Sequence, residues 1–212
     1  MKILFIGDLY GQQGVDYFLE NIGYLRQTYQ PNLIVVNAEN SSNGRGLSLS
    51  IYKSLMRAGV SLITMGNHTW KNKELETFIK DSKIIRPLND KSNLGDGYKV
   101  LNYNDKKILF INALGRIYMN DQEYDNPFFM VKEVLEKEEY DYSFLDFHAE
   151  ATSEKIAMGH YLDGKISAIV GTHTHIQTND NRMLPNGTLY ITDVGFTGPL
   201  NGVIGVDKDI II

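Results

Sequence analysis

The sequence predicts an α/β fold in which strands and helices alternate. Short apolar runs, typical of strands buried on both faces, recur along most of the chain. Longer segments with apolar side chains at helical spacing follow several of these runs. A strand, a crossover helix and a second strand normally form a right-handed unit with parallel strands. We therefore expect parallel pairing, with an antiparallel pair in the middle of the chain.

The first half of the chain contains three predicted strands, each followed by a predicted helix. The strands span residues 3–6, 33–36 and 62–65, and the helices span residues 15–29, 48–58 and 73–80. Pro31 ends the first helix, because the residue before a proline avoids helical geometry. The strand at residues 3–6 is uniformly apolar, so we expect it to be buried on both faces.

The second half is less regular. Residues 99–103 and 107–112 flank Asn104 and Asp105, which predicts an antiparallel hairpin with a tight turn. Further strands are expected at residues 143–147, 166–170 and 189–192, and further helices at residues 128–139 and 151–161. The chain closes on residues 203–212 and ends on three isoleucines.

Composition narrows the classes of function. With 212 residues and 42% hydrophobic content, we expect a single domain spanning residues 1–212. The net charge of -5, and the lack of any long Lys or Arg run, argue against binding of duplex nucleic acid. The sequence has no cysteine, which excludes disulfides and thiolate-ligated metal sites. Any metal must therefore be bound by oxygen and nitrogen ligands.

Targeting signals are not recognisable in the sequence. The apolar core at the start of the chain is too short for a signal peptide and ends at Asp8. No stretch approaches the ~20 apolar residues of a membrane span. We therefore expect a cytoplasmic protein without membrane contact.

Polar residues with metal-binding chemistry follow five of the predicted strands. They are Asp8, Glu39 and Asn40, Asn67 and His68, His148, and the pair His173 and His175. In open α/β sheets, ligands bind outside the carboxyl ends of the strands, so we expect these side chains to converge there. Singly, several have a structural explanation: Asp8 as a helix cap, the asparagines as turn residues, His148 as a core histidine. Glu39 is harder to explain in this way, because a buried unpaired carboxylate is costly. Their recurrence at one edge favours a shared site.

The candidate ligands outnumber what one tetrahedral ion needs, which indicates two metal ions. Two-metal sites need a bridging carboxylate, and Glu39 is the candidate. Mixed oxygen and nitrogen ligation favours Fe or Mn, with Zn also suitable, over Ca or Mg. Arg45 is a weaker candidate for contact with a substrate phosphate, and Asp193 is a candidate partner of a metal-bound histidine.

These residues also carry a resemblance to a known family. The motif series is Asp8, Asn37-Ala38-Glu39-Asn40, Gly66-Asn67-His68, the string from Asp146 to Glu154, and Gly171-Thr172-His173-Thr174-His175. It resembles that of the calcineurin-type metallophosphoesterases, and more closely their bacterial YmdB-like branch. Two departures from the broad superfamily, Tyr10 in place of histidine and Glu39 in place of a bridging aspartate, are features of that branch. The branch continues past the position of Ile212, so homo-oligomer formation stays open.

The resemblance implies a four-layer α/β/β/α sandwich with two mixed sheets. It also implies a di-iron or di-manganese centre and phosphodiesterase activity on small substrates such as 2′,3′-cyclic nucleotides. The implied ligands are Asp8, Glu39, Asn40 and His175 for one ion, and Glu39, Asn67, His148 and His173 for the other. His68 would be catalytic, and Asn40 would also contact substrate. The alternatives are a phosphomonoesterase or nuclease, or a metal-binding signalling or RNA-turnover scaffold.

Overall fold

The computed structural model describes residues 1–119 and 124–212 and contains two main sheets. The first sheet is parallel throughout and has four strands. Their order is β1 (Ile3–Ile6), β3 (Leu33–Asn37), β4 (Leu62–Thr64) and β5 (Ile84–Ile85). Their carboxyl ends therefore lie along one edge of the sheet.

The second sheet is mixed and has six strands. Their order is β10 (Arg182–Met183), β11 (Leu189–Ile191), β9 (Ala168–Thr172), β8 (Tyr142–His148), β7 (Lys106–Leu114) and β6 (Tyr98–Tyr103). The four central strands are parallel, and the two edge strands pair antiparallel. A separate small ribbon pairs β2 (Asp8–Leu9) with β12 (Phe196–Thr197) in parallel.

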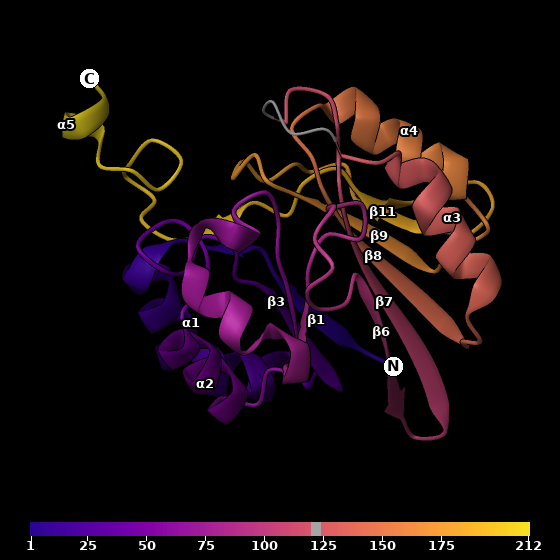
Figure 1. Cartoon of the computed structure of the whole chain (residues 1–212), viewed down its shortest axis with the longest axis horizontal. Helices are drawn as coiled ribbons and strands as arrows, with labels where there is room; N and C mark the ends of the chain where they lie inside the picture. Colours follow the sequence, from indigo (N-terminus) through magenta and orange to yellow (C-terminus); the bar gives the residue numbers. More distant parts are fainter. Residues whose placement is uncertain (120–123) are drawn as a thin grey trace.

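Helices cover the outer face of each sheet. The helices α1 (Gly11–Tyr29) and α2 (Leu49–Arg57) pack on the first sheet, and α3 (Pro127–Lys137) and α4 (Thr152–Leu162) pack on the second (Figure 1). This is the four-layer α/β/β/α sandwich that was expected. The expectation of two mixed sheets is wrong for the first sheet, which is parallel throughout because crossover connections join its strands. The short helix α5 (Lys208–Ile211) projects away from the layers. Across the described ranges, none of the helices combines the length and apolar character needed to cross a bilayer.

Strand β3 illustrates how one strand serves two cores. Ile34 and Val36 pack with the apolar faces of α1 and α2. Leu33 and Val35 point the other way, into an apolar layer shared with Phe110 of the second sheet. Alternate side chains of a strand face opposite sides, so a uniformly apolar strand is needed where both faces are covered.

The predicted hairpin and the helix at residues 48–58 are confirmed. The turn residues Asn104 and Asp105 have φ values of 46° and 61°, which a two-residue turn with the twist of the flanking strands requires. Helix α2 begins after Ser48, whose side chain accepts a hydrogen bond from the Ile51 N–H at 3.4 Å. This is the normal role of serine before a helix.

The helix expected at residues 73–80 is wrong. The structure has three 3₁₀ turns there, η1 (Thr69–Lys71), η2 (Lys73–Thr77) and η3 (Ile79–Asp81). The Thr77 hydroxyl donates to the Glu74 carbonyl at 2.7 Å, so a short polar side chain competes for a carbonyl that a continuous helix would use.

Other boundaries differ more modestly from the expectations. The first helix begins at Gly11, four residues early, because the glycines of its first turn carry no apolar pattern. Strand β9 lies two residues later than expected. Strand β1 packs on both faces, but as an edge strand it stays partly exposed. The two-residue strands β2, β5, β10 and β12 are too short to show a periodicity and were not predicted.

A buried ion pair ties α4 to the loops that follow β9 and β11. Lys155 Nζ lies 2.6 Å from Asp193 Oδ2 and donates to the Thr172 carbonyl at 2.7 Å. Both side chains are 1% exposed. The carboxylate of Asp193 also accepts hydrogen bonds from the Thr174 hydroxyl and the Gly195 N–H, each at 2.8 Å. Every charge in this pair is therefore compensated.

Replacing Lys155 by methionine should destabilise the protein strongly, because Asp193 would remain as a buried carboxylate without its cation. We expect Lys155→Met to lower the free energy of unfolding by about 3–5 kcal/mol in urea titrations of metal-free protein. Lys73, which forms an exposed pair with Glu76, supplies the control. Lys73→Met should change the same quantity by no more than about 0.5 kcal/mol. Equal effects of the two substitutions would show that the buried pair does not stabilise the fold.

Candidate metal centre

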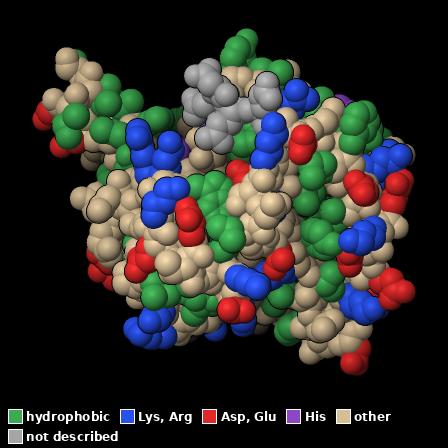
Figure 2. All heavy atoms as spheres, viewed as in Figure 1, with side chains coloured by type: hydrophobic (Ala, Val, Ile, Leu, Met, Phe, Trp, Pro, Cys, Tyr) green, Lys and Arg blue, Asp and Glu red, His purple; other side chains and the backbone are tan. Residues whose placement is uncertain are grey.

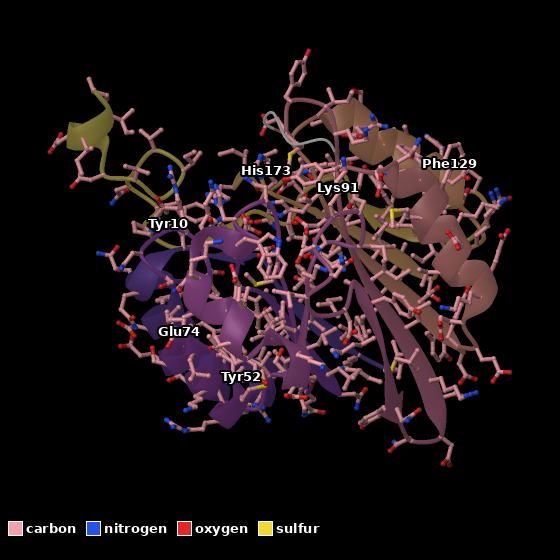
Figure 3. The ribbon with its side chains drawn as sticks, viewed as in Figure 1. Tyr10, Tyr52, Glu74, Lys91, Phe129 and His173 are labelled. Carbon is pink, nitrogen blue, oxygen red and sulfur yellow. The ribbon has the colours of Figure 1, made fainter. Side chains whose placement is uncertain are left out.

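The polar residues predicted from five strand ends meet where the carboxyl ends of the two sheets face each other. Asp8, Glu39 and Asn67 come from the first sheet and its connections, and His148 and His173 come from the second. In Figure 3 the labelled His173 lies on this edge, between the indigo-to-magenta half of the chain and the orange half. The sequence predicted that these residues lie along one edge of one sheet. In the structure the edges of two sheets meet, and each contributes part of the group.

Asp8 is a fully buried carboxylate without a matching donor. It lies in β2, held against β12, and its exposure is 0%. Within the described part of the chain, neither of its oxygens has a hydrogen-bond partner. His175 Nε2 lies 3.2 Å from Oδ2, a close contact that lacks hydrogen-bonding geometry. A buried carboxylate in this state is costly unless a cation compensates it.

His175 presents Nε2 toward this carboxylate. Its Nδ1–H donates to the Ile204 carbonyl at 2.8 Å, and this tautomer leaves the Nε2 lone pair facing Asp8. Nε2 also lies 3.1 Å from Asn40 Nδ2, and Phe196 stacks on the ring with centroids 5.0 Å apart. Burial disfavours the charged form of His175, but Asp8 and the Ile204 carbonyl outweigh it and raise its pKa.

Glu39 lies between two groups of donor atoms. Its Oε1 accepts from Asn40 Nδ2 at 3.0 Å on one side and lies 3.1 Å from His148 Nε2 on the other. Its Oε2 accepts from the backbone N–H of His68 at 2.8 Å. With 1% exposure, Glu39 has the position expected of a bridging carboxylate.

The second group of donor atoms surrounds His148 Nε2. Asn67 Oδ1 and His173 Nδ1 each lie 3.0 Å from it. The Thr172 hydroxyl donates to Asp146 at 2.6 Å, so we assign a proton to His148 Nδ1, which donates to the Thr172 oxygen at 2.9 Å. The Nε2 lone pair then faces other acceptors. Burial lowers the pKa of His148 to about 4, and burial together with the neighbouring His148 lowers that of His173 to about 3.

The histidine loop is held in a conformation that few residues adopt. His173 and His175 have φ values of 99° and 62°, in the left-handed region. Such backbone persists only where the surroundings enforce it, and it clusters at functional sites. The Thr174 side chain, between them, is held by Asp193. Asp193 thus contacts the histidine loop through Thr174, whereas the sequence had suggested a partner of a histidine ring.

His68 and Arg45 lie at the margin of the cluster. His68 Nδ1 is 2.7 Å from Asn40 Oδ1 and 3.6 Å from Glu39 Oε1, and a quarter of its side chain is exposed. Burial, opposed by the Glu39 charge, lowers its pKa. Arg45 is an exposed residue of the loop after Asn40, and its positive charge acts in the same direction on the pKa of His68.

Two residues of the centre were missed as individual candidates. A Cβ on Gly66 would collide with Glu39 Oε2 and His148 Nε2, so a side chain there would fill the space between the ligand atoms. In the sequence, the only indication of this role of Gly66 is that it directly precedes Asn67. Glu150 Oε2 lies 3.2 Å from His173 Nε2 and holds the far side of that ring. It lies in the string from Asp146 to Glu154.

The donor set fits bound metal ions. Ligand atoms of Glu39, His148 and His173 lie within 4.8 Å of one another. Lone pairs of the carboxylates and of the His148 and His173 rings face this space, and a bound cation would relieve their repulsion. The donors form two groups that share Glu39: Asp8, Asn40 and His175 on one side, Asn67, His148 and His173 on the other.

Comparisons with known proteins agree with this geometry. The chain is 47% identical over 216 residues to the 2′,3′-cyclic-nucleotide 2′-phosphodiesterase of Bacillus subtilis, with 100% of this chain and 81% of that protein covered. A crystal structure of a novel phosphatase from Mycoplasma pneumoniae superposes with a TM-score of 0.92, 44% identity, and coverage of 97% of this chain and 75% of that one. A hypothetical protein from Thermus thermophilus also has a TM-score of 0.92, with 41% identity and coverage of 97% and 80%. The family model of the YmdB-like proteins matches residues 4–212, and the chain therefore belongs to the YmdB-like protein family.

Proposed function

We propose that this protein is a metal-dependent phosphodiesterase that hydrolyses small phosphodiesters, preferentially 2′,3′-cyclic nucleotides. The observation that carries the proposal is the pair of donor groups joined by Glu39, since paired metal ions suit phosphoryl transfer. Membership of a metallophosphoesterase family implies divalent metal ions, and the Bacillus relative bears the name of a 2′,3′-cyclic-nucleotide phosphodiesterase. The choice of Fe or Mn, with Zn as a further option, is part of the proposal.

The proposed ligands of one ion are Asp8, Glu39, Asn40 and His175, and those of the other are Glu39, Asn67, His148 and His173. The short contacts of Asp8 with His175, and of His148 with Asn67 and His173, support this division. Asn40 is assigned to the first group by the family resemblance, because the atom that it turns toward Glu39 and His175 is its amide nitrogen. Bound divalent ions would stabilise negative charge on phosphate oxygens and lower the pKa of water.

His68 is proposed as the general acid. Asn40 Nδ2 donates to Glu39, so Asn40 Oδ1 is an acceptor and His68 Nδ1 donates to it. In the imidazolium form of His68, the other ring nitrogen carries the proton available to a leaving alkoxide. Burial makes the imidazolium a stronger acid. Arg45, with its exposed cation on the next loop, is a proposed phosphate contact.

Two alternative functions would use the same metal centre differently. A phosphomonoesterase or nuclease would use the same centre, but the net charge of -5 favours small substrates over long polynucleotides. A signalling or RNA-turnover scaffold would bind metal without turnover.

We propose that residues 1–212 act as a single domain, supported by the apolar layer between the two sheets. The cytoplasmic location and the oligomeric state stay predictions.

Protein loaded with Mn or Fe should contain about two ions per chain, because the donors exceed what one ion uses. We expect Glu39→Ala to lose both ions in elemental analysis and to lose all turnover of diesters, since Glu39 belongs to both groups. The exposed Glu76 is the control, and Glu76→Ala should retain both ions. A wild-type stoichiometry of one or less would contradict the dinuclear centre.

Hydrolysis of 2′,3′-cyclic nucleotides should be faster than that of 3′,5′-cyclic nucleotides with the same base. The strain of the five-membered cyclic phosphate lowers the barrier before the enzyme acts. The quantity to compare is kcat/KM for each pair. Equal or reversed values would rule out the proposed preference.

The roles of His68 and His173 should separate in mutants. His68→Ala should retain both metals and lose roughly 10²–10⁴ in rate on a cyclic nucleotide, whose alkoxide leaving group needs a proton. It should lose far less on bis(p-nitrophenyl) phosphate, whose leaving group departs unaided. His173→Ala should lose metal and both activities together. Metal loss in His68→Ala, or equal impairment on both substrates, would refute the acid role.

A further inference from the structure

A cavity of about 520 Å³ lies beside the turn that follows His68. Its wall includes Trp70, Asp90, Lys91, Ser92, Leu94 and Tyr124. Trp70 follows His68 by two residues, and the Lys71 N–H donates to the His68 carbonyl at 3.0 Å. The turn that presents His68 to the centre therefore also presents Trp70 to the cavity.

The indole ring of Trp70 is held in one orientation. The ring is half-buried, packs against the apolar core beneath α2, and also lines the cavity. Its N–H donates to Asp90 Oδ1 at 3.1 Å, and the same oxygen accepts from the Ser92 N–H at 2.8 Å. A fixed aromatic ring loses little conformational entropy when a planar ligand stacks on it.

The loop that carries Asp90 is also preorganised. The guanidinium of Arg86 donates to the Pro87 carbonyl at 2.7 Å and to the Leu88 and Leu94 carbonyls at 3.2 Å. Because one side chain binds both ends of this segment, the loop carrying Asp90 is closed around it. The wall does not have to form when a ligand enters.

Electrostatics connects the cavity with the metal centre. The pKa of Tyr124 is raised to about 12, chiefly by burial and further by the charges of Asp90 and Glu39. Tyr124 thus lies within electrostatic reach of both the cavity wall and the proposed bridging ligand. In Figure 3, the labelled Lys91 and His173 both lie in the upper central part of the view. Figure 2 shows Lys, Arg, Asp and Glu side chains spread over this face, with apolar surface between them.

We propose that this cavity binds the nucleobase of the substrate, with Trp70 as its stacking surface. The inference rests on the proposed function, because it assumes that a phosphodiester occupies the adjoining centre. Every base has a flat π face, so a single ring can accept different bases. A site of this size and mixed polarity has the dimensions of a small-molecule pocket. The base would then distinguish a nucleotide from other small phosphodiesters.

Kinetics of Trp70 variants test the assignment. Trp70→Leu should raise KM for 2′,3′-cyclic AMP about 10-fold to 100-fold, the range expected for loss of one stacked base. Its kcat/KM for bis(p-nitrophenyl) phosphate, which has no base, should stay within about twofold. Trp70→Phe should recover most of the loss. The control is Phe129→Leu, an exposed aromatic residue on α3, which should leave both substrates unaffected.

Fluorescence gives a readout without turnover, because Trp70 is the only tryptophan of the chain. In metal-free wild-type protein, 2′,3′-cyclic AMP should quench the emission, and ribose 5-phosphate should not. Unchanged KM in Trp70→Leu, equal loss on both substrates, or the absence of quenching would overturn the nucleobase site. Failure of wild-type protein to hydrolyse any diester would instead overturn the proposed function, and quenching by the nucleotide would still decide what the cavity binds.

Discussion

The structure depends on one electrostatic constraint, a buried group of acceptor atoms that face one another. Asp8 is completely buried and finds no hydrogen-bond donor among the described residues, and His148 and His173 bring two ring nitrogens within 3.0 Å. Buried charges and lone pairs of this kind are unfavourable without a cation. The arrangement makes physical sense as a preformed metal site, in which the fold bears the repulsion and bound ions relieve it.

The rest of the fold maintains this arrangement. Two sheets place their carboxyl ends face to face, and the apolar layer between them fixes that relation. The Lys155–Asp193 pair holds Thr174, and with it the left-handed backbone of both loop histidines. Gly66 leaves the space that the ligand atoms surround. The strained backbone of the histidine loop and the buried charges thus lie at the centre, and neighbouring residues such as Lys155 and Asp193 stabilise them.

Sequence patterns predicted the longer strands, the hairpin and the convergence of the polar residues, because periodicity and strand ends are local signals. They failed at residues 73–80, where Thr77 and its neighbours favour 3₁₀ turns over a helix that the apolar spacing suggested. Contacts that depend on tertiary structure left no local signal. The Ile204 carbonyl reaches His175 from 29 residues away, and Asp193 acts through Thr174. The facing of two sheets followed only from family resemblance.

The proposed centre and the Trp70 cavity together describe a nucleotide site with a phosphate end and a base end. The central claim is that Glu39 joins two metal ions. An anomalous difference map from crystals of the Mn-loaded protein tests it most directly. If Glu39 is the bridge, the map should contain two peaks about 3.5–4 Å apart with the Glu39 carboxylate between them. A single peak, or two peaks that do not both contact Glu39, would contradict it.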